Sequence, residues 1–449
     1  MTAEAKATPP LCTRCKEQDG VLGLRSETVC ETCFTTFVAS KAIKRLEVLQ
    51  RETRGPRLPS RPQRYLLALS RRPSSTALLH ILNENLRRQR ERNQRLKFEL
   101  VPVFVDVDVT DQPTASSNRT AVNADTATSS SSLSSASSDP TSKTPDAPEE
   151  ETTSPTDAFT AHFPELPIHK VPLSSILSSR AIDWTSLPPQ DPTHPPSQRL
   201  TDLFTNLPTA SARADVSRLL VRHALFAAAA THDCGVVLLG YNTTSLAELT
   251  LSEAAKGRGF GIPWLVNDGA FPLPRAIADD PAPTDLTSSS SQSNGSGGGG
   301  GAGMIQIYSP LREIFRKEIL TYLSIVSSAA GPLAELFPAS APSRATAVVS
   351  HRDLSLDDVV ARYFADVEAS YPSVVANVVR TTGKLNRASS GGRQCRLCGG
   401  GLDPLGDERW KGEIGEADAT ILSATDDNRD ERPLRKSMLC YGCDRSVKG

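Results

Sequence analysis

The sequence predicts an α/β protein built on a doubly wound parallel sheet, with a cysteine-rich module at each end of the chain. Two observations support this prediction. Through the middle of the 449 residues, apolar segments of strand length alternate with segments of helical periodicity, which is the pattern of a parallel sheet. Eight of the nine cysteines form four Cys-x-x-Cys pairs, two near each end. Two such pairs supply the four thiolates of a structural zinc site, so two zinc ions are expected.

The N-terminal module is expected over residues 1–40. Its ligands would be Cys12, Cys15, Cys30 and Cys33, with fourteen residues between the two pairs, close to the spacing of a zinc ribbon. Disulfides are the alternative, but they need an oxidising compartment, and the start of the chain lacks the apolar run of a secretory signal. A thioredoxin-like site would need a single pair in a βαβ setting. Zinc is the favoured interpretation.

A basic linker is predicted over residues 41–63, and a second basic cluster follows between Arg87 and Lys97. The whole chain has a net charge of −1, so only these local clusters bear on nucleic acid. Such clusters can neutralise RNA phosphates, although a solvated surface explains each of them equally well. The residues predicted to contact RNA are Lys41, Lys44, Arg45, Arg51, Arg54, Arg87, Arg88 and Arg90.

The central domain is expected over residues 64–385 and begins with a strand at 64–70, a polar turn, a helix at 76–87 and a strand at 99–106. A strand that leads through a tight turn into a helix forms a phosphate site, because the helix N-terminus presents free N–H groups. The nucleotide loop would consist of Ser70, Arg71, Arg72, Ser74 and Ser75.

The same alternation continues along the chain. A helix is expected at 215–231, a strand at 234–240, a turn at 241–245 with a helix after it, a strand at 304–309 and a helix at 311–323. Two tracts, at about 110–161 and 279–303, are rich in Ser, Thr, Pro or Gly. They cannot bury enough apolar surface to offset the entropy of ordering, so both are predicted to be disordered insertions.

The C-terminal module is expected over residues 386–449. Its ligands would be Cys395, Cys398, Cys440 and Cys443, but forty-one residues separate the two pairs. The closure of so long a loop costs more entropy, so zinc is less firmly indicated here, and an empty or oxidised set stays possible. The ninth cysteine, Cys234, begins an apolar strand and is expected to be a buried, inert thiol.

Four motifs together resemble the eukaryotic cytoplasmic tRNA 2-thiolation protein 2 family. They are Leu11-Cys-Thr-Arg-Cys15, Leu69-Ser-Arg-Arg-Pro-Ser-Ser75, Leu239-Gly-Tyr-Asn-Thr-Thr-Ser245 and Leu439-Cys-Tyr-Gly-Cys443. The resemblance covers the chain from Leu11 to Gly449 outside the two insertions. That family belongs to the PP-loop ATP pyrophosphatase group, so the resemblance implies a PP-loop, or adenine nucleotide hydrolase-like, sheet.

The chain departs from the pattern of active PP-loop proteins, which resembles Ser-Gly-Gly-x-Asp-Ser. Arg71 and Arg72 stand where paired glycines would let backbone N–H groups approach a pyrophosphate, and Ser74 stands at the acidic position. The second turn, Gly240 to Ser245, has no carboxylate where active thiolases carry acids for the nucleotide and its metal. The resemblance therefore implies no catalytic residue in this chain and makes ATP binding doubtful.

By this resemblance, the expected function is that of a subunit needed for 2-thiolation of wobble uridine, position 34, in cytoplasmic tRNA. The chain would hold tRNA as the non-catalytic half of a heterodimer with an active PP-loop paralogue, and a ubiquitin-like sulfur carrier would supply sulfur. The location would be cytoplasmic and without a membrane, since no stretch approaches the length of a span. Two alternatives remain open: an ATP-dependent tRNA sulfurtransferase active in its own right, and a zinc-dependent protein-interaction module.

Overall fold

The computed structural model describes residues 10–53, 62–107, 155–273, 304–337, 354–387, 394–402 and 439–449. The predicted insertion at 279–303 lies outside these residues, as does most of the one predicted at 110–161. The end of that first tract, however, forms helix α3 (Pro155–His162), in which Phe159 is buried. The prediction of disorder is wrong there, because Phe159 and Phe163 supply the apolar contacts that the preceding Ser-rich residues lack.

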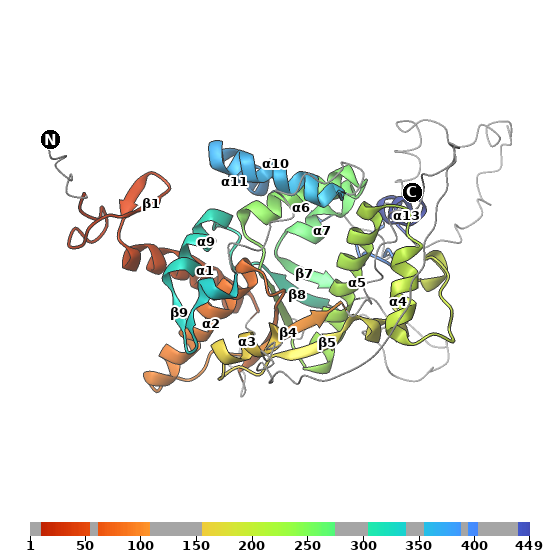
Figure 1. Ribbon diagram of the computed structural model, residues 1–449, viewed down its shortest axis with the longest axis horizontal. Helices are drawn as coiled ribbons and strands as arrows, with labels where there is room; N and C mark the ends of the chain where they lie inside the picture. Colours follow the sequence, from red (N-terminus) through yellow and green to blue (C-terminus); the bar gives the residue numbers. More distant parts are fainter. Residues whose placement is uncertain are drawn as a thin grey trace, which may run out of the picture.

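A six-stranded sheet in the order β5-β4-β3-β6-β8-β7 forms the centre of the molecule (Figure 1). Its strands are β3 (Gln63–Ala68), β4 (Phe98–Asp106), β5 (His169–Pro172), β6 (Val236–Leu239), β7 (Gly269–Pro272) and β8 (Met304–Tyr308). All neighbours pair in parallel except β7, which runs antiparallel to β8 at one edge. The parallel strands fall in the order third, second, first, fourth, fifth along the chain, so the winding reverses between β3 and β6. This confirms the predicted doubly wound sheet.

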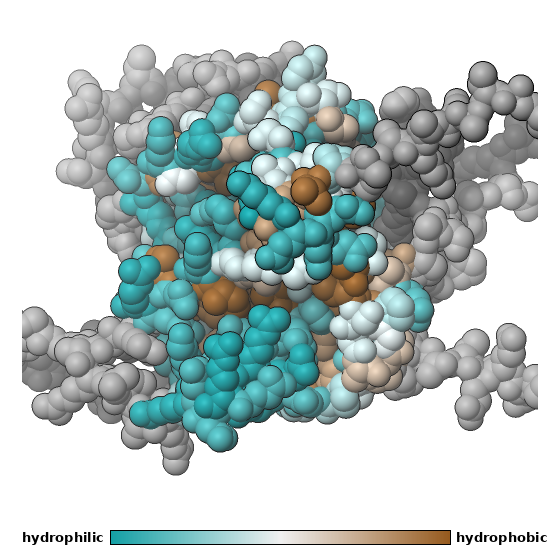
Figure 2. Space-filling model, turned by 90° about the vertical axis from the view of Figure 1, so that its left-hand side faces the viewer, coloured by the Kyte–Doolittle hydropathy of each residue, from teal (hydrophilic) through white to brown (hydrophobic). Residues whose placement is uncertain are grey.

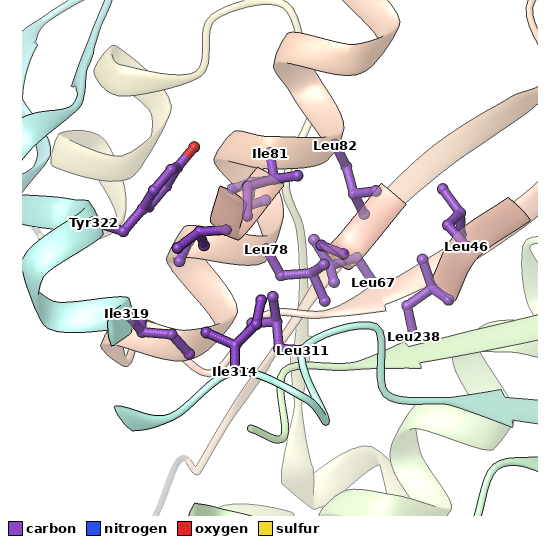
Figure 3. Packing of buried hydrophobic residues seen from close by; sticks show 14 of the residues in the cluster. Leu46, Leu67, Leu78, Ile81, Leu82, Leu238, Leu311, Ile314, Ile319 and Tyr322 are labelled. Atoms are coloured by element: carbon purple, nitrogen blue, oxygen red, sulfur yellow. The ribbon is translucent and has the colours of Figure 1, made fainter. Parts of the chain in front are cut away.

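Helices α1 (Glu31–Thr53), α2 (Pro73–Glu91) and α9 (Arg316–Ile325) cover one face of the sheet. Figure 3 shows how their apolar side chains meet: Leu46 of α1 lies beside Leu238, Leu78 of α2 lies beside Leu67, and Ile319 of α9 lies at the other end of the same cluster, beside Ile314. The predicted helix at 311–323 begins later, at Arg316, because residues 311–315 form a turn that buries Leu311 and Ile314 in this core.

Helices α4 (Pro196–Thr205) and α5 (Ala210–Thr231) cover the other face. Leu219 and Leu220 of α5 pack there with Leu66 and Val237, the residues of β3 and β6 that point away from the first core. Alternate strand residues thus serve opposite layers, as both-sided burial in a doubly wound sheet requires.

Helix α6 (Thr243–Ala255) is covered by a helical pair that the sequence analysis did not predict. In this pair, α10 (Leu356–Ser370) and α11 (Pro372–Thr382) bury Phe364 and Val375 against Leu246 of α6. The remaining short elements are β1 (Leu22–Leu24), β2 (Glu27–Val29), α7 (Ile262–Val266), β9 (Ser327–Ser328), β10 (Gly331–Pro332), α13 (Tyr441–Lys448) and the 3₁₀ turns η1 (Leu173–Ser178), η2 (Trp184–Ser186), η3 (Gly259–Gly261) and η4 (Leu333–Leu336).

Helix α1 corrects the predicted boundary at residue 40. It runs without a break from the N-terminal module through residues 41–53, which were predicted to be a linker. Phe34, Val38, Ala42, Leu46 and Leu49 recur every three or four residues and form its buried face. Lys41, Lys44, Arg45 and Arg51, four of the basic residues that predicted a linker, thus lie away from the buried face of a core helix. No helix among the described residues is long and apolar enough to cross a bilayer.

Candidate metal centres and nucleotide loop

The N-terminal module brings its four cysteines together beside the start of α1. The sulfur atoms of Cys12, Cys15, Cys30 and Cys33 all lie within 4.8 Å of one another, and those of Cys15 and Cys30 are 3.8 Å apart. Lys16 adopts a positive φ of 59° where the first Cys-x-x-Cys turn closes. The β1–β2 hairpin then returns the chain to Cys30, whose sulfur accepts a hydrogen bond from the backbone N–H of Cys33 at 3.4 Å.

The C-terminal module forms a second, separate centre. The sulfur atoms of Cys395, Cys398, Cys440 and Cys443 also lie within 4.8 Å of one another, despite the forty-one residues between the pairs. The sulfurs of Cys398 and Cys440 are 3.8 Å apart, and the N–H of Cys440 donates to the sulfur of Cys395 at 3.2 Å. In Figure 1 the N-terminal module and α13 lie at opposite ends of the molecule. Each set can therefore hold its own metal ion.

The pKa values of two thiols of the N-terminal centre, Cys12 and Cys33, are shifted in opposite directions. Burial raises the pKa of Cys12, but backbone N–H groups of Cys15, Cys30 and Arg14 lower it more, to about 6. The hydrogen bond with Cys30, followed by burial, raises the pKa of Cys33 to about 12. Backbone N–H groups therefore favour the thiolate form of Cys12 even without a cation. A bound metal cation would stabilise all four thiolates directly.

The C-terminal centre is part of the sheet's core. Cys395, Cys398 and Cys443 are buried in the same apolar cluster as Leu219 and Val237. The Nη1 of Arg258 donates to the sulfur of Cys443 at 3.7 Å. Such outer contacts orient metal ligands and stabilise their negative charge.

Arg258 also joins this centre to a buried network of charges. Its Nε donates to Glu253 at 2.6 Å, and its Nη2 bonds to Asp215. Asp215 in turn accepts a hydrogen bond from Ser446 of α13 at 2.8 Å. Burial alone would raise the pKa of Asp215, but Arg258, Arg218 and Lys256 hold that pKa well below its usual range.

Close packing explains why the Leu-Cys-Tyr-Gly-Cys motif contains a glycine. A Cβ on Gly442 would lie 2.4 Å from Cγ of Arg258 and 2.6 Å from the backbone oxygen of Lys256. Beside it, Gly257 has a φ of 79°, and a Cβ there would lie 2.7 Å from the ring of Tyr441. The C-terminal module therefore sits against residues 256–258 with no room for another side chain.

The predicted nucleotide loop lies at the carboxyl end of β3, next to the reversal of the winding. The hydroxyl of Ser75 accepts from the N–H of Ser70 at 3.2 Å, contacts the hydroxyl of Ser70 at 3.0 Å, and donates to the carbonyl of Arg72 at 3.0 Å. Arg71 has a positive φ of 54°, as a glycine there could. Its guanidinium stacks over Phe104 of β4, 3.8 Å from the ring centroid.

The second loop, after β6, closes directly onto the first. Asn242 caps α6 by accepting from the N–H of Ser245 at 2.8 Å, and its side-chain amide donates to the hydroxyl of Ser74 at 2.8 Å. A Cβ on Gly240 would lie 2.8 Å from Cα of Ser75. Protein atoms therefore occupy the junction where doubly wound sheets usually take their ligands.

The hydroxyls that replace acids in this second loop have structural partners. Thr243 donates to the carbonyl of Arg312 at 2.8 Å, and Thr244 donates to the buried carboxylate of Glu368 at 2.5 Å. Neither of the two loops contains a carboxylate, so their side chains are a poor ligand set for Mg²⁺.

The basic residues of α1 divide into two groups. Lys41 pairs with Glu313 at 2.9 Å, and Arg45 pairs with Asp268, so both tie α1 to the turn after β8 and to the segment before β7. Lys44 and Arg51 are exposed. Arg54 lies outside the described residues.

The second basic cluster, on α2, is largely neutralised. Arg87 pairs with Glu84 at 2.7 Å and with Glu91 at 3.4 Å, and Arg90 pairs with Glu165 at 2.7 Å. Arg88 is exposed. The carboxylates next to this cluster weaken its field toward a phosphate.

Sequence reasoning missed the roles of two residues. The sequence analysis places Asn242 only in a turn and assigns no role to Arg258. The only local signals are the Asn-Thr-Thr-Ser cap pattern and an arginine flanked by glycines. The contacts that matter here, from Asn242 to Ser74 and from Arg258 to Cys443, each join residues more than 160 positions apart along the chain.

Known proteins with similar sequences carry the name of the family that the four motifs resemble. Residues 355–445 match the family model described as cytoplasmic tRNA 2-thiolation protein 2. A protein of that name from Phaeosphaeria nodorum is 31% identical over 458 residues, covering 98% of this chain and 95% of the relative. Another from Sclerotinia sclerotiorum is 33% identical over 373 residues, covering 82% and 80%.

One solved structure is similar to this chain at a TM-score of 0.46 and 13% identity: the U34-tRNA thiolase NcsA from Methanococcus maripaludis with its [4Fe-4S] cluster. The match covers 87% of this chain and 95% of that one. The two relatives show the family, because their identity of about one third extends over most of both chains. The chain belongs to the cytoplasmic tRNA 2-thiolation protein 2 family.

Proposed function

We propose that this chain serves the 2-thiolation of wobble uridine 34 in cytoplasmic tRNA as a non-catalytic subunit, paired with a PP-loop paralogue that retains an active loop. The observation that carries the proposal is the hydrogen bond from Asn242 to Ser74, which joins the two loops that would have to part around a nucleotide.

Three features of the junction argue against ATP activation by this chain. Gly240 lies against the backbone of Ser75, so the two loops are in direct contact at this point. The side chain of Arg71 is stacked on Phe104. The hydroxyls of Thr243 and Thr244 are already hydrogen-bonded within the protein. ATP binding would require breaking these contacts without any carboxylate in either loop to hold the accompanying Mg²⁺.

The remaining cysteine also supports a non-catalytic role. Cys234, the one cysteine outside the two centres, is buried just before β6. Burial raises its pKa to about 11, so its sulfur is a protonated thiol and a poor nucleophile near neutral pH. In this proposal, sulfur passes from a ubiquitin-like sulfur carrier to the paralogue's site, and this chain contributes tRNA holding instead.

Both cysteine centres fit structural zinc. When four thiolates surround Zn²⁺ at about 2.3 Å, tetrahedral geometry separates them by about 3.8 Å. The sulfur pairs Cys15–Cys30 and Cys398–Cys440 are each 3.8 Å apart. A cluster of several irons would hold its thiolates farther apart, because metal and sulfide atoms lie between them. Zinc would stabilise the fold of each module through its cysteines and take no part in the thiolation reaction.

Co-expression with the active paralogue tests the proposal. We expect a one-to-one complex by size-exclusion chromatography with light scattering. ATP/pyrophosphate exchange in the presence of tRNA should require the paralogue and be absent from this chain alone. Exchange by the purified chain would instead identify it as a sulfurtransferase in its own right. A chain that stays monomeric beside the paralogue would also overturn the proposal.

A further inference from the structure

We infer that a groove along α1, beside the N-terminal cysteine centre, binds the phosphate backbone of tRNA. The inference rests on the proposed role of the chain in holding tRNA and locates that contact. The groove has a volume of about 420 Å³. It is lined by Arg14, Thr32, Cys33, Thr36, Phe37, Ser40, Lys41 and Lys44.

The lining residues follow the helix in two parallel rows. Thr32, Thr36, Ser40 and Lys44 recur every four residues, and Cys33, Phe37 and Lys41 form the row beside them. Four residues rise about 6 Å and the longer row spans roughly 18 Å. The groove thus offers polar groups at a regular spacing, which suits a polymer with regularly repeated anions such as RNA.

The hydroxyls of the first row are available to a ligand. Within the described part of the chain, the side chains of Thr32, Thr36 and Ser40 have no hydrogen-bond partner, whereas neighbouring Thr35 donates back to Glu31. Hydroxyl groups of Ser and Thr are common donors to phosphate oxygens, and such contacts fix the position of the nucleic acid without reading its sequence.

Cations gather around the second row. Arg14, Arg25 and Lys41 lie 4.8, 5.3 and 6.0 Å from the ring centroid of Phe37. These contacts hold three positive charges at one wall of the groove. Arg14 and Lys41 also pair with Glu27 and Glu313 across half-exposed contacts. Pairs of this kind contribute little and can be exchanged for a phosphate.

Lys44 is the least compensated charge in the groove. It is exposed at the end of the hydroxyl row and has no ion-pair partner among the residues that the structure describes. Figure 2 faces the side of the molecule that carries α1 and the N-terminal module, where hydrophilic side chains dominate and apolar patches are small and separate. A charged ligand fits this surface better than an apolar one.

The experiment uses the full chain in complex with its paralogue and measures fluorescence anisotropy of labelled substrate tRNA at several salt concentrations. Lys44→Ala should weaken binding severalfold and lower the slope of log affinity against log salt by roughly 0.7 to 0.9, the value of one lost phosphate contact. Lys44→Arg should keep the slope. Thr36→Val combined with Ser40→Ala should weaken binding and leave the slope nearly unchanged, because no charge is lost.

Arg88→Ala, which removes an exposed cation from α2, is the matched control and should change neither quantity. Equal thermal midpoints and metal contents of all variants would exclude misfolding. If the Lys44 and hydroxyl variants bind tRNA as tightly as the wild type and with the same slope, the groove is not the binding site. The proposed role of the chain in holding tRNA would still stand. If the wild-type chain adds no tRNA affinity to the paralogue, the holding role itself fails. Displacement by polyglutamate but not by RNA would identify a protein site instead.

Discussion

The side-chain amide of Asn242 donates a hydrogen bond to the hydroxyl of Ser74 over 2.8 Å, although the two residues are 168 positions apart. Each belongs to a loop that leads from a central strand into a helix, so the bond joins the N-terminal ends of α2 and α6. In a nucleotide enzyme those two ends would face the phosphates. In this family member they face each other, and the junction holds the two halves of the sheet together.

Asn242→Ala should therefore destabilise the protein by about 2 kcal/mol, because it removes the α6 cap and the bond to Ser74 together. Ser74→Ala removes only the bridge and should cost about 1 kcal/mol. Urea unfolding followed by circular dichroism measures both. Equal stability of the two variants and the wild type would show that the junction contributes nothing to the fold.

The sequence predicted the features that depend on neighbouring residues, and missed those that depend on contacts between distant residues. The strand at Gln63–Ala68, the helix after it and each Cys-x-x-Cys pair are encoded by residues close together in the chain, and the expected elements and cysteine groups are present. The prediction of a linker at Lys41 and Arg45 is wrong, because Val38, Ala42 and Leu46 form a buried face that continues the helix through these basic residues. The α10–α11 pair has an ordinary amphipathic pattern, but its contact with α6 could not be read from periodicity alone.

Metal analysis should find two zinc ions per chain. Cys12→Ser and Cys440→Ser should each lose one, since the two groups of sulfur atoms are separate. The thermal midpoint should fall in both variants, because Cys12 is buried in the core cluster that includes Leu67, and Cys440 packs against the one that includes Val237. Elemental analysis and calorimetry check these outcomes. Iron in place of zinc, or loss of both ions in one variant, would contradict the assignment.

Gly442→Ala should destabilise the C-terminal centre by about 1 to 3 kcal/mol, the usual cost of overpacking. The new Cβ would lie 2.4 Å from Arg258 and 2.6 Å from the Lys256 carbonyl, so residues 256–258 or α13 must shift. Gly259→Ala is the matched control, because a Cβ there meets nothing within 4 Å. Chelator-induced zinc release should accelerate for Gly442→Ala alone. Release at the same rate from both variants would show that the close packing does not support the centre.

The stability of the protein should fall as the pH drops below about 6.5, and His80 should account for part of the fall. Its ring is buried and contacts the hydroxyl of Tyr322 at 2.9 Å, and burial lowers its pKa. The unfolded chain then takes up a proton at a higher pH than the folded chain does. The contribution of neutral His80 to the free energy of unfolding is fully present above the pKa of the unfolded chain. It decreases between that pKa and the lower pKa of the folded chain, by at most about 1.4 kcal/mol per pH unit. His80→Asn should flatten this decrease, measured by denaturant unfolding between pH 7.5 and 5. His194→Asn is the control of opposite sign, because the hydrogen bond with Asp202 raises the pKa of His194. A slope unchanged in His80→Asn would mean that His80 is already charged in the folded protein or that its ring gains access to water.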